Sequence, residues 1–224
     1  LTSGCPETED ETRPNPLLEV PESASWSLPC LQQPVHVVRT EHDVPHIYAE
    51  TEQDLACAQG FVTARDRFFQ MDLIARAGLG TVAEIFGGGG LSSDIDTRSR
   101  GGRMIADQLL ESTTSEERAT WTAYADGVNA YIDRVRSGEF PPPAELEASY
   151  LFLGVESPAD LMVDWGPLHL AGVASTVNFV SGFETTDIKN QEKVDQLADY
   201  GTGLPESQLR HDGAVYDIWE NIAP

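Results

Sequence analysis

His42 and His46 are the residues whose type and spacing come nearest to a recognisable chemical site. Two histidines four residues apart on a helix can bind one zinc ion. Pro45 and the alternating apolar residues around it indicate strands or a turn instead, where that spacing does not bring both rings to one metal. A stand-alone zinc hydrolase using this pair is therefore only an alternative, which metal analysis of the purified protein would test.

Other signatures of nucleophilic or phosphate chemistry are missing from the 224 residues. The sequence has no Gly-x-Ser-x-Gly segment and no evident Ser, His and Asp set. The glycines from Gly87 to Gly90 are not followed by the Lys-Ser/Thr pair of a phosphate-binding loop, so a flexible connection is the better interpretation. By its motifs alone, the chain is acidic and mostly helical, with no complete active site of its own.

The charge of the chain bears on its partners. Fourteen Lys and Arg against 37 Asp and Glu give a net charge of −23, which repels nucleic acid phosphates and anionic lipids, so no nucleic acid partner is expected. The acidity either serves solubility or matches a basic partner surface. An apolar content of 40% can supply a real core, and no apolar run approaches the length of a membrane span.

The three cysteines have different settings. Cys57 lies among apolar residues and is most simply a packed thiol. Cys5 and Cys30 flank a Pro-rich acidic segment, so a disulfide between them is possible in an oxidising compartment. The first residues, Leu-Thr-Ser-Gly-Cys, also look like the end of a bacterial lipoprotein signal, in which Cys5 would carry a lipid anchor after export.

The stretch from Thr51 to Glu84, most of it a predicted long helix, must organise the rest of the chain. Thr51 and Asp54 resemble a capping box, and Gly78 is well placed to end the helix. Three-and-four spacing gives two apolar stripes, which predict burial on two sides. The stripes are Leu55, Ala58, Val62, Phe69 and Leu73, and Cys57, Phe61, Ala64, Phe68 and Ala75.

A row of charge runs between these stripes. Arg65, Asp72 and Arg76 lie on it, and Asp72 and Arg76 are one helical turn apart. Charges flanked by apolar surface must be paired, because removing one partner leaves a buried ion at a cost of roughly 3–5 kcal/mol. We therefore expect all three side chains to form internal ion pairs.

The remaining elements are predicted from turns and periodicity. Trp26 and Leu28 are expected to anchor an extended N-terminal arm. Two short strands lie on either side of a turn at Glu41 to Asp43. Helices are predicted over 81–86, 95–110, 115–136, 157–180 and 192–199, and the helix over 157–180 either continues or restarts at 168. A loop is predicted over 178–190.

Four linked blocks resemble the start of the penicillin acylase family. They are Asp43-Val-Pro-His-Ile-Tyr-Ala49, Asp54-Leu-Ala-Cys-Ala-Gln-Gly60, Ala64-Arg-Asp-Arg-Phe-Phe-Gln-Met-Asp72 and Gly80-Thr-Val-Ala-Glu84. The family pattern usually has Gly where Asp43 stands. Asp tolerates a left-handed turn better than most residues, so the hairpin is expected to survive this difference.

This resemblance implies an α+β fold that is built from two chains with different roles. In the family, a precursor cuts itself into a smaller α chain and a larger β chain, whose N-terminal Ser is the nucleophile. The present sequence resembles the α chain, a mostly helical part of a four-layer α-β-β-α N-terminal-nucleophile hydrolase that adds a short hairpin to the shared sheets. Residues 1–33 would form the arm, and 34–224 the α-chain part of a single domain completed by the β chain.

The resemblance also implies an exported, periplasmic amide hydrolase and names candidate site residues. Ser175-Thr-Val-Asn-Phe179 and Phe183 resemble the wall of the acyl pocket, with Phe179 as the first candidate and Asn178 beside it. Thr185-Thr-Asp187-Ile-Lys-Asn190 resembles a segment with a ligand of a structural calcium, so Asp187 is the first candidate ligand and Glu184 the second.

Some alternatives stay open at this stage. The aromatic residues could simply pack between helices, and Asp187 could be a solvated carboxylate. The substrate could be a penicillin, an acyl-homoserine lactone or a lipopeptide. A non-enzymatic acidic binding or scaffold protein would also fit the charge and the missing nucleophile, and would be a soluble monomer when expressed alone.

Overall fold

The computed structural model describes residues 20–182. Contacts divide the chain into two units with a boundary between Thr176 and Val177, and packing is therefore described up to Thr176. The described part is mostly helical with one small hairpin, as predicted. Its elements in order are β1 His36–Arg39, β2 Pro45–Tyr48, α1 Glu52–Leu79, α2 Ala83–Phe86, α3 Leu91–Ser99, α4 Gly102–Ser112, α5 Ser115–Arg136, α6 Ala144–Leu153 and α7 Pro167–Gly182, with 3-10 turns at Glu41–Asp43, Gly87–Gly89 and Pro158–Leu161.

The predicted hairpin is present. β1 and β2 pair antiparallel, with Val37 opposite Ile47. His42 and Asp43 in the connecting turn have φ angles of 70° and 60°, which is the left-handed region. Asp is one of the few residues that adopt this region without a large penalty, so the turn forms without a glycine at Asp43.

Helix α1 begins as its sequence predicts. The Thr51 hydroxyl accepts a hydrogen bond from the Asp54 backbone N–H at 3.1 Å. The predicted end at Gly78 is wrong, because the helix continues to Leu79 and is capped by Gly80, which has a φ of 69°. Gly78 is required for packing instead, since a Cβ placed on it would lie 2.1 Å from the carbonyl oxygen of Gly172 in α7. The helix is also kinked at Arg67 (φ −147°, ψ 32°).

The two apolar stripes of α1 are not buried equally. All five residues of the second stripe, from Cys57 to Ala75, are buried. In the first stripe Ala58 and Val62 are buried, Phe69 and Leu73 are half-buried, and Leu55 is 39% exposed. The prediction that α1 is buried on two sides is thus confirmed for the middle of the helix. It is wrong at Leu55, close to the N-terminal end.

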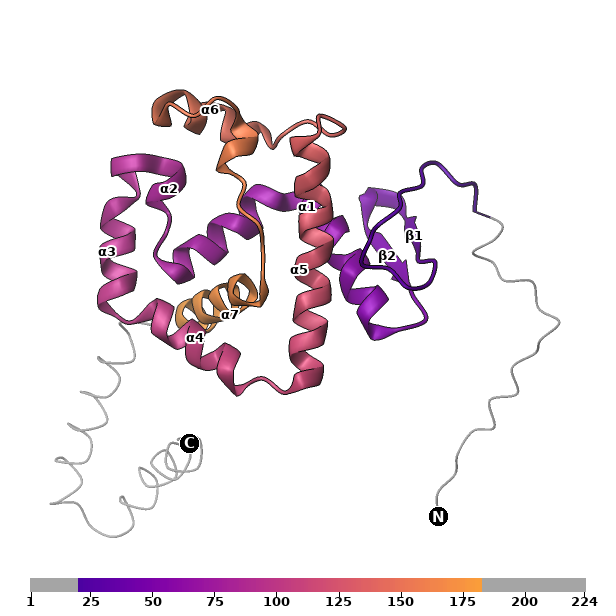
Figure 1. Cartoon of the computed structure of the whole chain (residues 1–224), viewed down its shortest axis with the longest axis horizontal. Coiled ribbons are helices and arrows are strands. Elements are labelled where there is room, and N and C mark those ends of the chain that lie inside the picture. The colour runs from indigo at the N-terminus through magenta and orange to yellow at the C-terminus, as the bar shows by residue number, and fades with distance from the viewer. Residues whose placement is uncertain (1–19, 183–224) are drawn as a thin grey trace, which may run out of the picture. The chain divides into compact units, whose positions relative to one another are not determined.

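The core lies where α5 crosses α1 (Figure 1). The two backbones come together at glycines: a Cβ on Gly60 would lie 2.0 Å from the Tyr124 carbonyl oxygen, and one on Gly127 would lie 1.9 Å from the Cys57 carbonyl oxygen. Aromatic rings fill the space beside this contact, among them Phe61, Phe68, Tyr131 and Phe140. Close backbone approach and ring packing together make this crossing the centre of the described structure.

The N-terminal arm is attached to this core as predicted. Leu28 is buried, and the Trp26 ring packs against Phe61 at a centroid distance of 5.8 Å. The buried carboxylate of Asp54 accepts a hydrogen bond from the Gln32 backbone N–H at 2.6 Å. This bond and one from the Thr51 hydroxyl hold the pKa of Asp54 below its usual range.

The cysteine prediction is corrected by the structure. Cys30 forms a disulfide with Cys57, so Cys57 is not a free packed thiol and Cys30 is not paired with Cys5. The bond joins the arm to the interior of α1 and closes a loop with a sequence separation of 27 residues. Cys5 lies outside the described residues.

Three helix predictions also change. The single helix expected over 95–110 is two helices, α3 and α4, separated at Gly101, whose φ of 78° cannot continue a helix. Helix α6 was not predicted, because its run of mixed apolar residues has no clear helical period. Asn178 to Gly182 are helical in α7 rather than part of a loop, while the helix expected over 192–199 lies outside the described residues.

Candidate functional site

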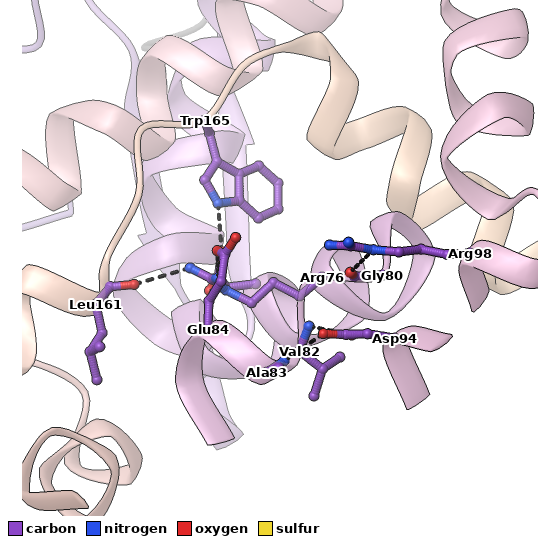
Figure 2. Close-up of polar contacts among 10 residues, drawn as sticks. Arg76, Gly80, Val82, Ala83, Glu84, Asp94, Arg98, Leu161 and Trp165 are labelled. Carbon is purple, nitrogen blue, oxygen red and sulfur yellow. Dashed lines mark hydrogen bonds and ion pairs between the residues drawn. The ribbon is translucent and has the colours of Figure 1, made fainter. Parts of the chain in front are cut away.

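A buried ion pair lies beyond the kink of α1 (Figure 2). Nε of Arg76 donates to Oδ2 of Asp72 at 2.6 Å, and the two side chains are 2% and 4% exposed. Their spacing of four residues on a helix brings the groups together, as predicted. The pair is buried because α1 is covered here by the segment that leads into α7.

Arg76 satisfies its remaining donors on two other elements. One terminal nitrogen donates to Glu84 of α2 at 2.5 Å, and the other to the Leu161 carbonyl oxygen at 3.0 Å. The guanidinium group therefore connects α1, α2 and the segment between α6 and α7 (Figure 2). Arginine suits this role, because its charge is permanent and its donors point in several fixed directions.

Arg65 behaves differently from the prediction. Its guanidinium group lies over the Trp26 ring, 4.5 Å from the ring centroid, and the residue is exposed. The expected internal ion pair of Arg65 is thus replaced by a cation–π contact with the N-terminal arm. The charge row is a buried pair at one end and a surface contact at the other.

Helix α3 holds the short α2 in place. Asp94 is buried, and its carboxylate accepts hydrogen bonds from the backbone N–H groups of Val82 at 2.7 Å and Ala83 at 2.8 Å. Nε of Arg98 donates to the Gly80 carbonyl oxygen at 2.8 Å (Figure 2). A carboxylate at a helix N-terminus satisfies free N–H groups there, so a helix of four residues is held by its neighbour rather than by its own bonds.

Three polar groups of Trp165, which lies just before α7, form hydrogen bonds: the indole N–H, the backbone N–H and the backbone carbonyl. Its indole Nε1 donates to Oδ1 of Asp72 at 3.0 Å. Asn129 of α5 accepts from the Trp165 backbone N–H at 2.7 Å and donates to its carbonyl oxygen at 2.9 Å. The roles of Trp165 and Asn129 could not be predicted from spacing, because Trp165 lies 93 residues from Asp72 and 36 residues from Asn129 along the chain. Glu84 is eight residues from Arg76 and lies on a different helix, so the four-residue spacing rule does not connect these two either.

His169 in the first turn of α7 is stacked on Trp165, with ring centroids 5.3 Å apart. The Gly166 backbone N–H donates to its Nδ1 at 3.1 Å, so this nitrogen is unprotonated and the neutral ring carries its proton on Nε2. Burial lowers the pKa of His169 below 6.5, against the opposing effect of the Asp72 carboxylate.

This lowered pKa predicts a pH effect on stability. The unfolded protein protonates His169 near its ordinary pKa of about 6.5, whereas the folded protein protonates it only at lower pH. The neutral ring therefore makes its full contribution to stability above the unfolded-state pKa of about 6.5. That contribution is lost as the pH falls toward the folded-state pKa. Thermal unfolding at about pH 7.5 and about pH 5 is expected to show a larger loss of Tm in the wild type than in His169→Gln. His36→Gln, in the exposed hairpin, is the control, and equal losses in all three proteins would contradict the prediction.

The structure places only part of the predicted acyl-pocket segment. Asn178 and Phe179 lie near the end of α7, and Phe179 is 40% exposed. Phe183 and the two candidate calcium ligands, Asp187 and Glu184, lie outside the described residues. The roles of all five residues stay predictions.

The histidine pair lies on the hairpin, as the local pattern predicted. His42 occupies the turn, and Nε2 of His46 on β2 lies 3.4 Å from the Thr40 hydroxyl. Among residues 20–182, no three His, Cys, Asp or Glu side chains are grouped so that they could hold a metal ion. In the same range no helix has both the length and the apolar character to cross a membrane.

Comparison with known proteins identifies what the chain is similar to. The family model for penicillin amidase matches residues 34–210. Penicillin acylase 2 proenzyme of Pseudomonas sp. strain SE83 is 36% identical over 162 residues, and penicillin G acylase of Escherichia coli is 36% identical over 116 residues. These alignments cover 72% and 50% of this chain.

An acyl-homoserine lactone acylase, QuiP of Pseudomonas fluorescens strain Pf-5, is 33% identical over 122 residues, or 54% of this chain. The chain spans only 14–19% of the length of these three relatives. A solved structure of the thermostable penicillin G acylase from Alcaligenes faecalis is similar in fold, with a TM-score of 0.56 and 24% identity. That similarity covers 87% of this chain and 94% of the solved chain.

Proposed function

The chain belongs to the penicillin amidase family, and from that premise we propose that it is the α chain of a self-processing linear amide hydrolase. The observation that carries the proposal is how much of each relative this chain matches. The family match extends over residues 34–210, yet the chain spans less than a fifth of its curated relatives, and it matches nearly all of a solved acylase chain in fold. A larger β chain from the same precursor would complete the four-layer domain.

The chemistry would lie on the β chain. Its N-terminal Ser would attack the carbonyl carbon of an acyl amide, and the free α-amine of the same residue would take the hydroxyl proton. Backbone and amide donors would stabilise the tetrahedral oxyanion. This arrangement accounts for the missing nucleophile and base in the present sequence.

The substrate would be an acyl amide. Relatives are named as acylases of penicillin and of acyl-homoserine lactones, and a lipopeptide is the third class that we consider. We assign the acyl pocket to the end of α7, with Phe179 as its main contact and Asn178 and Phe183 beside it. Activity on penicillins would bear on antibiotic resistance, and activity on acyl-homoserine lactones on quorum quenching.

Calcium and export complete the proposal. Asp187, with Glu184 as second choice, would supply one oxygen ligand of a structural calcium, and the β chain would supply the others, because one carboxylate alone binds calcium weakly. The Cys30–Cys57 disulfide supports export to the periplasm, since such bonds persist in oxidising compartments. Cys5 is outside that disulfide and is the proposed lipid anchor.

The test is expression of the precursor, namely this chain together with the polypeptide encoded downstream. We expect spontaneous cleavage into two chains that remain associated, a new N-terminal Ser by mass spectrometry, and amide hydrolysis. Alanine in place of that Ser should abolish both cleavage and hydrolysis. A precursor that stays uncut and inactive, while this chain alone is a soluble monomer, would favour an acidic binding or scaffold protein instead.

Phe179→Ala and Phe183→Ala are expected to change acyl preference more than self-processing. A pocket contact discriminates between acyl groups by about tenfold or more, because each misplaced methylene in an apolar pocket costs about 1–3 kcal/mol. The measurement is kcat/KM for a series of acyl lengths, together with the rate of precursor cleavage. Val180→Ala, a neighbouring exposed position, is the matched control. If both phenylalanine variants keep the acyl selectivity of the wild type, the assignment of the acyl pocket to the end of α7 is wrong.

A further inference from the structure

The backbone hydrogen bonds of the hairpin alternate along its length. The Thr40 N–H donates to the Val44 carbonyl oxygen at 3.1 Å, next to the pair formed by Arg39 and Pro45. In an antiparallel ladder, pairs whose residues bond each other alternate with pairs whose residues do not. Arg39 and Pro45 are therefore a non-hydrogen-bonded pair. The backbone N–H and C=O groups of such residues point away from the partner strand, toward the outer edges of the hairpin.

The two outer edges of the hairpin differ in the donors that they offer. Val37 and Ile47, two positions further along, are the next non-hydrogen-bonded pair. The outer edge of β1 thus presents a donor and an acceptor at both Val37 and Arg39. On β2, Ile47 presents both groups, but Pro45 has no N–H. The β1 edge is complete, whereas the β2 edge lacks a donor at its first residue.

The complete edge is also less covered by the rest of the chain. Within residues 20–182, no other group forms a hydrogen bond with the backbone N–H or C=O of Val37 or Arg39. β2 lies against α1, and Ile47 packs on the main apolar core. Val37 lies opposite Ile47 on the same face, yet it is 39% exposed. The apolar cover of the hairpin therefore reaches β2 more completely than β1.

An open strand edge of this kind suits one class of partner. Its unpaired groups are a template for another extended segment, and a two-stranded hairpin is only marginally stable in water by itself. Val37 and Tyr48 are both exposed and lie on opposite faces of the hairpin. Apolar surface on both faces fits a strand in a wider sheet that is covered on both sides. The chemistry of the edge thus favours an extended strand of a folded partner.

We propose that the outer edge of β1 pairs with an extended strand of the β chain, through the backbone groups of Val37 and Arg39. The choice of partner is argued from length, since this chain spans only 14–19% of three curated relatives and the greater part of such a protein is other sequence. This inference rests on the proposed function, because it requires a β chain. It goes beyond that function by naming the strand and the two residues that join the chains.

Amide hydrogen exchange in the processed enzyme tests the pairing residue by residue. The amides of Val37 and Arg39 are expected to exchange about a hundredfold more slowly than that of Ile47, because only the first two would be hydrogen-bonded. The amide of Val38, bonded within the hairpin, is the internal reference for slow exchange. Fast exchange at Val37 and Arg39 would overturn the inference. Slow exchange at Ile47 alone, or equally slow exchange at all three, would also overturn it, because the protection would not be specific to β1.

Two proline substitutions test the edges separately. Val37→Pro and Ile47→Pro each remove one outward N–H and leave the hairpin's own hydrogen bonds in place. Val37→Pro is expected to weaken the association of the two chains by about tenfold to a hundredfold relative to Val37→Ala, because a buried acceptor on the partner strand loses its donor. Ile47→Pro is the matched control and should associate as strongly as Ile47→Ala. The measurement is the separation of the processed chains in urea, monitored by size-exclusion chromatography.

The wild-type precursor separates this inference from the proposed function. If it is cut and its chains associate, but Val37→Pro associates as strongly as Val37→Ala, only this inference is wrong. If the wild type yields no second chain, the proposed function fails and the inference fails with it. A dimer of this chain that Val37→Pro disrupts would place a second copy at the edge, which also overturns the inference. Should the Val37→Pro precursor fail to fold, the exchange rates of the wild type decide alone.

Discussion

Gly127→Ala is expected to destabilise the protein by about 3 kcal/mol or more, because overpacking by even one methyl group is costly where nothing can move aside. The added Cβ would lie 1.9 Å from the Cys57 carbonyl oxygen and 2.9 Å from the Phe61 backbone nitrogen. Both are backbone atoms of α1, so no side chain can rotate to make room. The helices would have to separate by more than an ångström, which would also loosen the aromatic packing beside them.

Thermal and denaturant unfolding of the purified protein measure this effect. Gly88→Ala is the matched control, since a Cβ there would meet no atom within 4 Å. The control is expected to change stability by less than about 0.5 kcal/mol, as surface substitutions usually do. A Gly127→Ala protein as stable as the control would show that the two helices are not in backbone contact.

Asp72→Ala is expected to cost roughly 3–5 kcal/mol, because it leaves Arg76 as a buried charge without its one buried carboxylate partner among the described residues. The same substitution removes the acceptor of the Trp165 indole N–H, so a second buried group loses its bond. Glu84 and the Leu161 carbonyl oxygen would still contact Arg76, but Glu84 is more than half exposed and compensates the charge incompletely.

Asp107→Ala is the control for this change. Asp107 pairs with Arg103 at the same four-residue spacing in α4, but both side chains are about half exposed. Exposed pairs of this kind contribute about 0–1 kcal/mol, so the control separates burial from charge pairing as the cause. Denaturant unfolding of both variants gives the comparison, and equal losses would mean that the Asp72–Arg76 pair is no more important than a surface pair.

The parts of the fold that could be predicted from the sequence are those with local causes. The Thr51 cap, the left-handed Asp43 turn and the Asp72–Arg76 pair all depend on residues within four positions of each other. The break between α3 and α4 also has a local cause at Gly101, but the apolar period across it continues and hides the break. Local signals predicted both ends of α5, at Ser115 and Arg136, and the end of α2 at Phe86, whereas α3 begins four residues before the predicted start at Ile95.

The features that could not be predicted depend on distant contacts. Gly78 looked like a helix end, and only the approach of Gly172 in α7 explains why it lies within the helix. Three cysteines allow several pairings, and only the path of the arm beside α1 selects Cys30–Cys57. Trp165 and Asp72 are 93 residues apart, so no spacing rule brings them together.

The candidate site was predicted through resemblance rather than through periodicity. Asn178 and Phe179 are single residues in an apolar helix, with no charge or spacing that marks them. Their proposed role depends on a second polypeptide, whose groups would form the rest of the pocket. On the proposed function, the residues that form the site would be divided between two chains, and the present chain alone would supply only part of them.

The Cys30–Cys57 bond makes the hairpin part of a covalent ring. The ring contains β1, β2, their exposed turn at Glu41–Asp43 and the first residues of α1. A single peptide-bond cleavage in that turn would open the ring without releasing a fragment, because the arm would remain joined to α1 through the sulfur atoms. The N-terminal arm and α1 are therefore covalently linked in two independent ways.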